Sequence, residues 1–95
     1  MGQKFSAEKT PGAIVDYKIN WDLILAKSNP VDTINSSSWT TSGTYTIDSD
    51  SHTDSQTTVW VSGGTLDDFS KLVNTVTTTG GRTYQASIEI SIKEA

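Results

Sequence analysis

The sequence predicts an all-β fold, because apolar and polar residues alternate along several segments and turn-forming residues separate those segments. The clearest alternation runs through residues 84–93. Its apolar positions are Tyr84, Ala86, Ile88, Ile90 and Ile92. A weaker stripe occupies residues 72–78, and Gly80-Gly81 lies between the two stripes. These residues predict two antiparallel strands joined as a hairpin, each with one buried face.

The length of the hairpin loop decides whether the two stripes share a face. An odd number of loop residues places them together, whereas a two-residue Gly-Gly turn would set Val76 opposite Gln85 and turn one stripe outward. We therefore expect a loop of three or five residues. The pairs expected with it are Val76 with Ala86, Asn74 with Ile88, and Leu72 with Ile90.

The elements before the hairpin are shorter. Residues 13–22 predict a strand with Val15, Tyr17, Ile19 and Trp21 on one face. Asp22 is expected to cap a single helical turn that ends before Pro30. The segments that follow are a weak strand at 33–40, a short strand at 44–48, a polar loop at 48–54 and a strong strand at 56–62.

Six to seven short strands with turn signals between them predict a small immunoglobulin-like antiparallel β-sandwich. Residues 13–95 are expected to form this single domain. Residues 1–12 are polar and are broken by Pro11-Gly12. We expect them to be a flexible N-terminal arm.

Composition narrows the classes of function. The 95 residues carry a net charge of −4 and the basic residues are dispersed, so no nucleic-acid partner is expected. The chain has no cysteine, which excludes disulfides and thiolate metal sites and favours folding in a reducing cytoplasm. The longest apolar run, Leu23 to Ala26, is too short to span a bilayer, and no signal-peptide pattern is present. No membrane partner is expected.

The sequence offers little for catalysis. Residues 48–54 alternate side chains that could hold a cation, but Thr53 and Val59 break the EF-hand pattern, and a solvated loop is the simpler interpretation. His52 is the only histidine, which excludes a multi-histidine zinc site and leaves a catalytic triad without support. We therefore expect no enzymatic activity and no catalytic, cofactor or metal residues.

Trp60 does not fit a solvated strand face. Val59 and Val61 take one face of their strand, so Trp60 points the other way. Either the domain itself covers both faces of this strand, or Trp60 anchors a partner protein, since tryptophan is enriched at interface hot spots. Trp21 is expected in the core, and Trp39 fits either position.

Four segments occur in a characteristic order. They are Ala13 to Tyr17 with Asn20-Trp21, Asp32-Thr33-Ile34 leading to Trp39, Thr58 to Thr65, and Asn74 to Thr78 with Gly81-Arg82-Thr83. Together they resemble a family of small structural proteins of tailed bacteriophages and prophages, described as fibre–tail adaptor or neck–tail proteins. The resemblance covers roughly residues 9–92; residues 28–44 and 48–56 depart from it by being more serine-rich.

The resemblance implies an immunoglobulin-like virion protein without catalysis. Such a protein is made and assembled in the bacterial host cytoplasm, and it binds a connector, tail tube or fibre protein. It also implies a homo-oligomer within a symmetric multi-copy assembly. The expected contact residues are Trp60, Trp39, and Lys4 and Phe5 of the arm, which could add to a neighbour's sheet edge.

Two other functions remain open. One is a decoration protein displayed on the capsid, which would bind only assembled capsids. The other is a carbohydrate-binding module that stacks sugars on exposed Trp39, Tyr45 or Trp60. Ring formation, or co-purification with a connector or fibre protein, would favour the adaptor.

Overall fold

Seven β-strands and one short helix build the protein in the computed structural model, which describes residues 2–27 and 32–94. The elements are β1 (Gly2–Lys9), β2 (Ile14–Asn20), α1 (Asp22–Leu25), β3 (Ile34–Thr41), β4 (Tyr45–His52), β5 (Gln56–Gly63), β6 (Phe69–Thr78) and β7 (Thr83–Ile92). The all-β class and the number of strands predicted from the sequence are confirmed.

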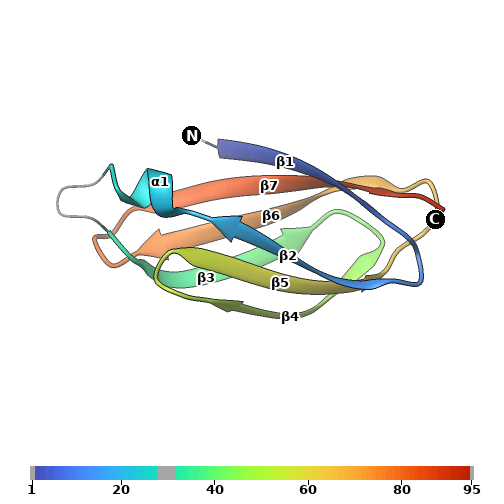
Figure 1. Cartoon of the computed structure of the whole chain (residues 1–95), viewed down its shortest axis with the longest axis horizontal. Helices are drawn as coiled ribbons and strands as arrows, with labels where there is room; N and C mark the ends of the chain where they lie inside the picture. Colours follow the sequence, from blue (N-terminus) through green and yellow to red (C-terminus); the bar gives the residue numbers. More distant parts are fainter. Residues whose placement is uncertain (1, 28–31, 95) are drawn as a thin grey trace.

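The strands form two sheets packed face to face as an elongated sandwich (Figure 1). One sheet has the order β1-β7-β6-β3 and the other the order β2-β5-β4. Neighbouring strands are antiparallel except β1 and β7, which run parallel. The sandwich is confirmed, and only its β1–β7 edge departs from the antiparallel arrangement that the sequence predicts.

The core lies between the sheets and consists of the inward-facing apolar positions. The fully buried side chains include Val59 and Val61 of β5 and Ile90 and Ile92 of β7. Trp21, only 1% exposed, stacks on Tyr84 with ring centroids 6.5 Å apart. Burying side chains of this size stabilises a fold by roughly 1.5–3 kcal/mol each. The core position expected for Trp21 is confirmed.

The β6–β7 hairpin has the odd-length loop that the two stripes require. The Thr78 N–H donates to the Arg82 carbonyl at 2.8 Å, which leaves residues 79–81 as the loop. The expected pairs are wrong by two residues, because Val76 lies opposite Tyr84, and Asn74 opposite Ala86. The reason is the position of the turn.

Gly81 closes this loop rather than standing at its centre. Its φ of 88° is the left-handed conformation that ends a three-residue hairpin loop. The Gly81 N–H also donates to the Thr78 carbonyl at 3.0 Å. Centring the loop on Gly80 shifts every cross-strand pair by two residues, which keeps both stripes facing the core.

A polar network crosses the core between the sheets. Asn74 of β6 is fully buried within the apolar stripe, and its Oδ1 accepts from the Thr57 hydroxyl of β5 at 2.7 Å and from Trp21 Nε1 at 3.2 Å. Its Nδ2 donates to Ser37 Oγ and to the Ser38 carbonyl of β3, both at 2.9 Å. Because buried polar groups are costly when unpaired, this asparagine fixes the alignment of three strands and Trp21.

Three local expectations change. Residues 48–52 belong to β4 rather than to a loop, because their backbone pairs with β5 across a bulge between Ile47 and Ser49. Asp22 begins α1 without capping it; Trp21 is the N-cap residue, and the Asp22 N–H donates to Asn20 Oδ1. The segment predicted as a flexible arm is, from Gly2 to Lys9, strand β1 of the larger sheet.

Candidate protein interface

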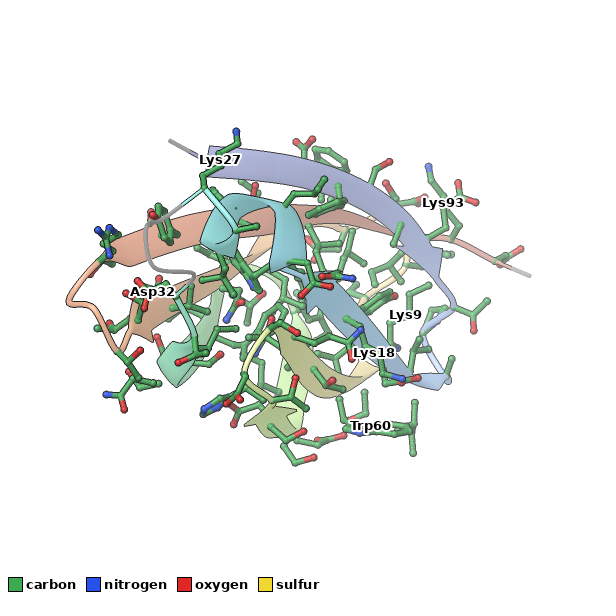
Figure 2. All side chains as sticks on the ribbon, turned by 60° about the vertical axis from the view of Figure 1, so that its left-hand side comes forward. Lys9, Lys18, Lys27, Asp32, Trp60 and Lys93 are labelled. Carbon is green, nitrogen blue, oxygen red and sulfur yellow. The ribbon has the colours of Figure 1, made fainter. Side chains whose placement is uncertain are left out.

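Trp60 stands on the outer face of the three-stranded sheet. It lies in β5, the central strand of that sheet, opposite Asp16 of β2 and Ser49 of β4. Val59 and Val61 on either side of it are completely buried, whereas Trp60 is 43% exposed. Figure 2 shows its side chain projecting away from the ribbon. No further layer of the domain covers this face within the described residues.

Ile14 adds a second apolar side chain to the same face. It pairs with Ser62, so it lies diagonally across from Trp60, and it is 68% exposed. Beside these two residues, Lys18 Nζ lies 3.3 Å from the Asp16 carboxylate. We call Ile14, Asp16, Lys18 and Trp60 the Trp60 face. An aromatic and an aliphatic side chain bordered by a charged pair is the arrangement found at protein interfaces.

The three aromatic residues considered for sugar stacking differ in exposure. Tyr45 is only 3% exposed and belongs to the core. Trp39 of β3 packs against the core as a partly buried side chain, and its Nε1 is buried without a partner among the described atoms. Trp60 is the most exposed of the three. Tyr45 is therefore excluded as a sugar-stacking residue, whereas Trp60 remains available for that role.

The four expected contact residues do not come together. Trp60 lies on the three-stranded sheet, whereas Trp39 lies on β3, at the far edge of the other sheet from β1. Phe5 of β1 is 42% exposed, and Lys4 is paired with Ser87, its side chain lying outside the described part of the structure. Trp60 and Phe5 are both exposed but belong to separate surfaces, and the sequence gives no sign of that separation. It also does not single out Ile14, because only the β2–β5 register places this residue opposite Ser62.

A buried carboxylate ties two distant segments together at one end of the sandwich. The Asp32 carboxylate accepts from the Thr33 and Gly80 N–H groups, each at 3.0 Å, and from the Thr79 hydroxyl at 3.1 Å. Arg82 Nη1 lies 3.0 Å from its other oxygen. Hydrogen bonding by the Thr78 hydroxyl, then by Gly80, Thr33 and Thr79, holds the pKa of Asp32 well below its usual range against the opposing effect of burial. We call these residues the Asp32 clasp.

The clasp joins two of the segments that carry the family resemblance, Asp32-Thr33-Ile34 and Gly81-Arg82-Thr83. A protein-family model described as podophage GP4 fiber-tail adaptor protein gp77 matches residues 9–91. The chain belongs to this family. The resemblance drawn from the sequence is thereby confirmed, and no curated protein matches the chain.

The match to the fibre-tail adaptor family spans β2 to β7 nearly completely. It includes the Trp60 face, the Asp32 clasp and the buried Asn74 network. It begins at Lys9, the last residue of β1, so the preceding part of that strand lies outside the matched region. The family's name describes a structural protein of a phage tail.

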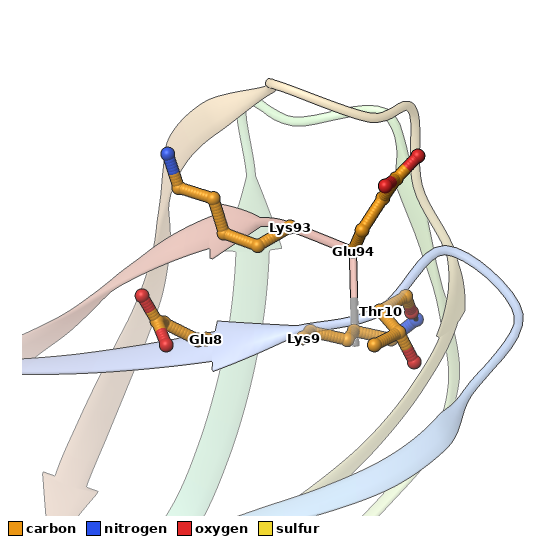
Figure 3. A pocket seen from close by; sticks show the side chains of 5 residues that line it. All are labelled: Glu8, Lys9, Thr10, Lys93 and Glu94. Carbon is orange, nitrogen blue, oxygen red and sulfur yellow. Dashed lines mark hydrogen bonds between the residues drawn. The ribbon is translucent and has the colours of Figure 1, made fainter.

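A shallow hollow marks the end of β1 in this family member. Its lining comes from the ends of β1 and β7, namely Glu8, Lys9, Thr10, Lys93 and Glu94 (Figure 3). Side chains of both charges surround it, and no group of three or more His, Cys, Asp or Glu that could hold a metal occurs in residues 2–27 and 32–94. The same residues contain no helix long and apolar enough to cross a membrane.

Lys9 faces inward at this end of β1. It is only 3% exposed, and its Nζ donates to the Thr10 carbonyl at 3.0 Å and to the Gly63 carbonyl of β5. Burial lowers the pKa of the Lys9 ammonium, and the charge of Asp48 partly opposes that shift. This lysine therefore links β1 to the opposite sheet through carbonyl groups.

Proposed function

We propose that this chain is a non-enzymatic virion protein, an adaptor in the tail or neck region that binds neighbouring virion proteins in a symmetric multi-copy assembly. The family description supports a structural role in the tail. The observation that carries the proposal for this chain is the Trp60 face. Its partners are virion proteins of the connector, tail tube or fibre.

The Trp60 face has the features of a contact surface. A tryptophan at the centre of a sheet face gains strongly from burial, and truncating such an anchor to alanine commonly costs a complex 2 kcal/mol or more, roughly thirtyfold in affinity. Ile14 widens the apolar area, while the Asp16–Lys18 pair stays at the border, where charges are only weakly stabilising but restrict which partners fit.

The proposal includes no catalytic step. The sole histidine, His52, is exposed at the end of β4, and the chain has no cysteine. The most perturbed carboxylate, Asp32, is fully engaged in holding the β6–β7 turn. Assembly takes place in the host cytoplasm, where a fold without disulfides suffices.

The experiment that tests this function is affinity capture of tail proteins by a tagged chain in cells that express the virion genes. We expect connector, tube or fibre proteins to co-purify, and Trp60→Ala to reduce their recovery at least tenfold. Phe69→Ala is the matched control, because Phe69 is an aromatic residue of β6 that is 63% exposed on the other sheet.

Three outcomes would contradict the proposal. Capture of capsids alone would indicate a decoration protein. Glycan binding that is lost in Trp60→Ala would indicate a carbohydrate-binding module. Equal recovery with Trp60→Ala and Phe69→Ala would remove the Trp60 face as the contact surface.

A further inference from the structure

Strand β1 is attached to the sandwich along one side only. Among residues 2–27 and 32–94 its single strand neighbour is β7, and eight register pairs run in parallel from Gly2 opposite Gln85 to Lys9 opposite Ile92. Figure 1 shows β1 lying along β7 at the edge of the sandwich. Strands β2, β3 and β4 form the other sheet edges, whereas β5, β6 and β7 each have a neighbour on both sides. An edge strand of this kind can leave without breaking any other pair in its sheet.

The inner face of β1 adds little to the core. Phe5, Ala7 and Lys9 pair with Ile88, Ile90 and Ile92, and paired residues share a face of the sheet. Phe5 remains 42% exposed and Ala7 supplies a single methyl group. The three isoleucines opposite them are at most 4% exposed. The apolar core therefore belongs to β7, and β1 acts mainly as a backbone cover for its edge.

The edge of β7 requires such a cover. Without β1, the ten-residue strand β7 would present unpaired N–H and C=O groups along one side. Exposed edges of this length tend to pair with another chain. Every copy of the protein carries the same β1 and the same slot, which is the edge of β7 that β1 covers. The β1 of a neighbouring copy could therefore fill the slot with an identical set of contacts.

The polar contacts of β1 are equally transferable. Lys9 Nζ donates to the Gly63 carbonyl, and the Lys93 N–H donates to the Lys9 carbonyl at 2.9 Å. Both partners lie on elements that remain in place when β1 leaves. The strand is thus held mainly by its backbone ladder with β7, by Lys9 and by the Ala7 methyl group, and a second copy would offer the same partners to these groups.

The connection between β1 and β2 is a short turn. Residues 10–13 reverse the chain, and the Ala13 N–H donates to the Thr10 carbonyl at 3.2 Å. Pro11 and Gly12 stand between them. Opening this turn costs one backbone hydrogen bond and would carry β1 away from its own sandwich. Short turns of this kind are the hinges at which identical strands exchange between protomers.

We propose that β1 is exchanged between copies, each chain adding its β1 to β7 of the next copy in the parallel register seen here. This inference deepens the proposed function and rests on its multi-copy assembly. Strand and slot lie on different parts of the chain, so the contact is head-to-tail and closes into a ring when the rotation allows. High local concentration in the growing particle favours exchange, because the contacts within one chain and between chains are the same.

Cross-linking between defined positions tests the exchange. Ser6 of β1 pairs with Glu89 of β7, and the chain has no cysteine of its own. We would prepare Ser6→Cys/Glu89→Cys chains with two different tags, mix them at increasing concentrations and in assembled particles, and treat them with a short bismaleimide. We expect a product within single chains when dilute and products joining the two tags when concentrated or assembled.

Two hinge variants of the same double-cysteine chain sharpen the result. Deleting Pro11 and Gly12 removes the residues that reverse the chain, so we expect the within-chain product to be lost and the between-chain product to persist. Inserting four Gly/Ser residues after Gly12 instead makes the chain reversal easier. The within-chain product should then form at every concentration below assembly.

Cross-links confined to single chains at all concentrations, and in assembled particles, would overturn the exchange. The same result together with normal capture of tail proteins would leave the adaptor function standing. Loss of that capture would remove the adaptor function independently of how β1 pairs.

Discussion

The Arg82 guanidinium lies 3.0 Å from the Asp32 carboxylate, joining the entry of β3 to the β6–β7 turn across fifty residues of chain. The carboxylate is nearly inaccessible, with a side-chain exposure of 4%, while the arginine remains half exposed. The two N–H groups that also bond Asp32 come from Thr33 and Gly80. The Asp32 side chain therefore holds the β6–β7 turn against the start of β3, and its removal should destabilise both.

Asp32→Asn should lower the thermal midpoint of unfolding. The difference in midpoint from the unaltered protein should shrink as the pH becomes acidic. Because the folded pKa of Asp32 is lowered from its ordinary value of 3.8, the unfolded chain binds the extra proton first as the pH falls. The carboxylate therefore contributes its full stabilisation above about pH 4 and loses it as the pH falls towards the folded pKa. Thermal unfolding followed by circular dichroism from pH 7 to pH 2 measures this.

The matched control for the clasp is Asp22→Asn, since Asp22 is exposed at the start of α1. We expect its melting curves to follow those of the unaltered protein at each pH. A pH profile of Asp32→Asn that runs parallel to the unaltered one would show that the clasp does not depend on the charge.

Asn74→Ala should destabilise the fold by about 2–4 kcal/mol, because it leaves a cavity and removes the acceptor of two buried donors. Trp21 Nε1 would keep only Thr57 Oγ1 as a partner, at 3.2 Å. Chemical denaturation gives the free energy of unfolding. Asn35→Ala, at an exposed position of β3, should change it by no more than about 0.5 kcal/mol. Equal effects at the two asparagines would contradict the role given to the buried network.

Gly81→Ala should cost about 1–2 kcal/mol, because alanine is strained in the left-handed conformation that Gly81 adopts. An added Cβ would meet no atom within 4 Å, so the loss reports backbone strain alone. Gly12→Ala is the comparison, since its Cβ would be equally free and its φ lies outside the left-handed region. We expect that variant to be neutral or slightly more stable. A similar loss at both glycines, measured by denaturation, would argue against the three-residue loop.

Much of the fold follows from the sequence, and particular residues show where the prediction stops. The parity of the β6–β7 loop was predictable because side chains alternate with a period of two, so an even loop would expose one stripe. The exact partner of Val76 was not, because a loop centred on Gly80 or one centred on Gly81 satisfies the same parity. Asn74 shows the same limit: its place in an apolar stripe predicts burial, but not the Thr57 and Trp21 groups that satisfy it.

The candidate surface divides in the same way. Trp60 was predictable as an outward-facing residue from Val59 and Val61, while the absence of a covering layer over it among the described residues emerged only from the packing of the two sheets. Ile14 joined it through the β2–β5 register. Tyr45 was misjudged because an aromatic ring suits a buried strand position as well as an exposed one.

By itself, the sequence determined the all-β class, the main hairpin with its odd loop, and the family, because alternation and residue order are properties of the chain read locally. Only the tertiary structure decided that β1 runs parallel to β7, that Asp32 reaches Arg82, and that Trp60 and Ile14 share an open face. Those relationships join residues far apart in the chain. Their free energies depend on which surfaces meet when the sheets close, and no local pattern of side chains encodes that choice.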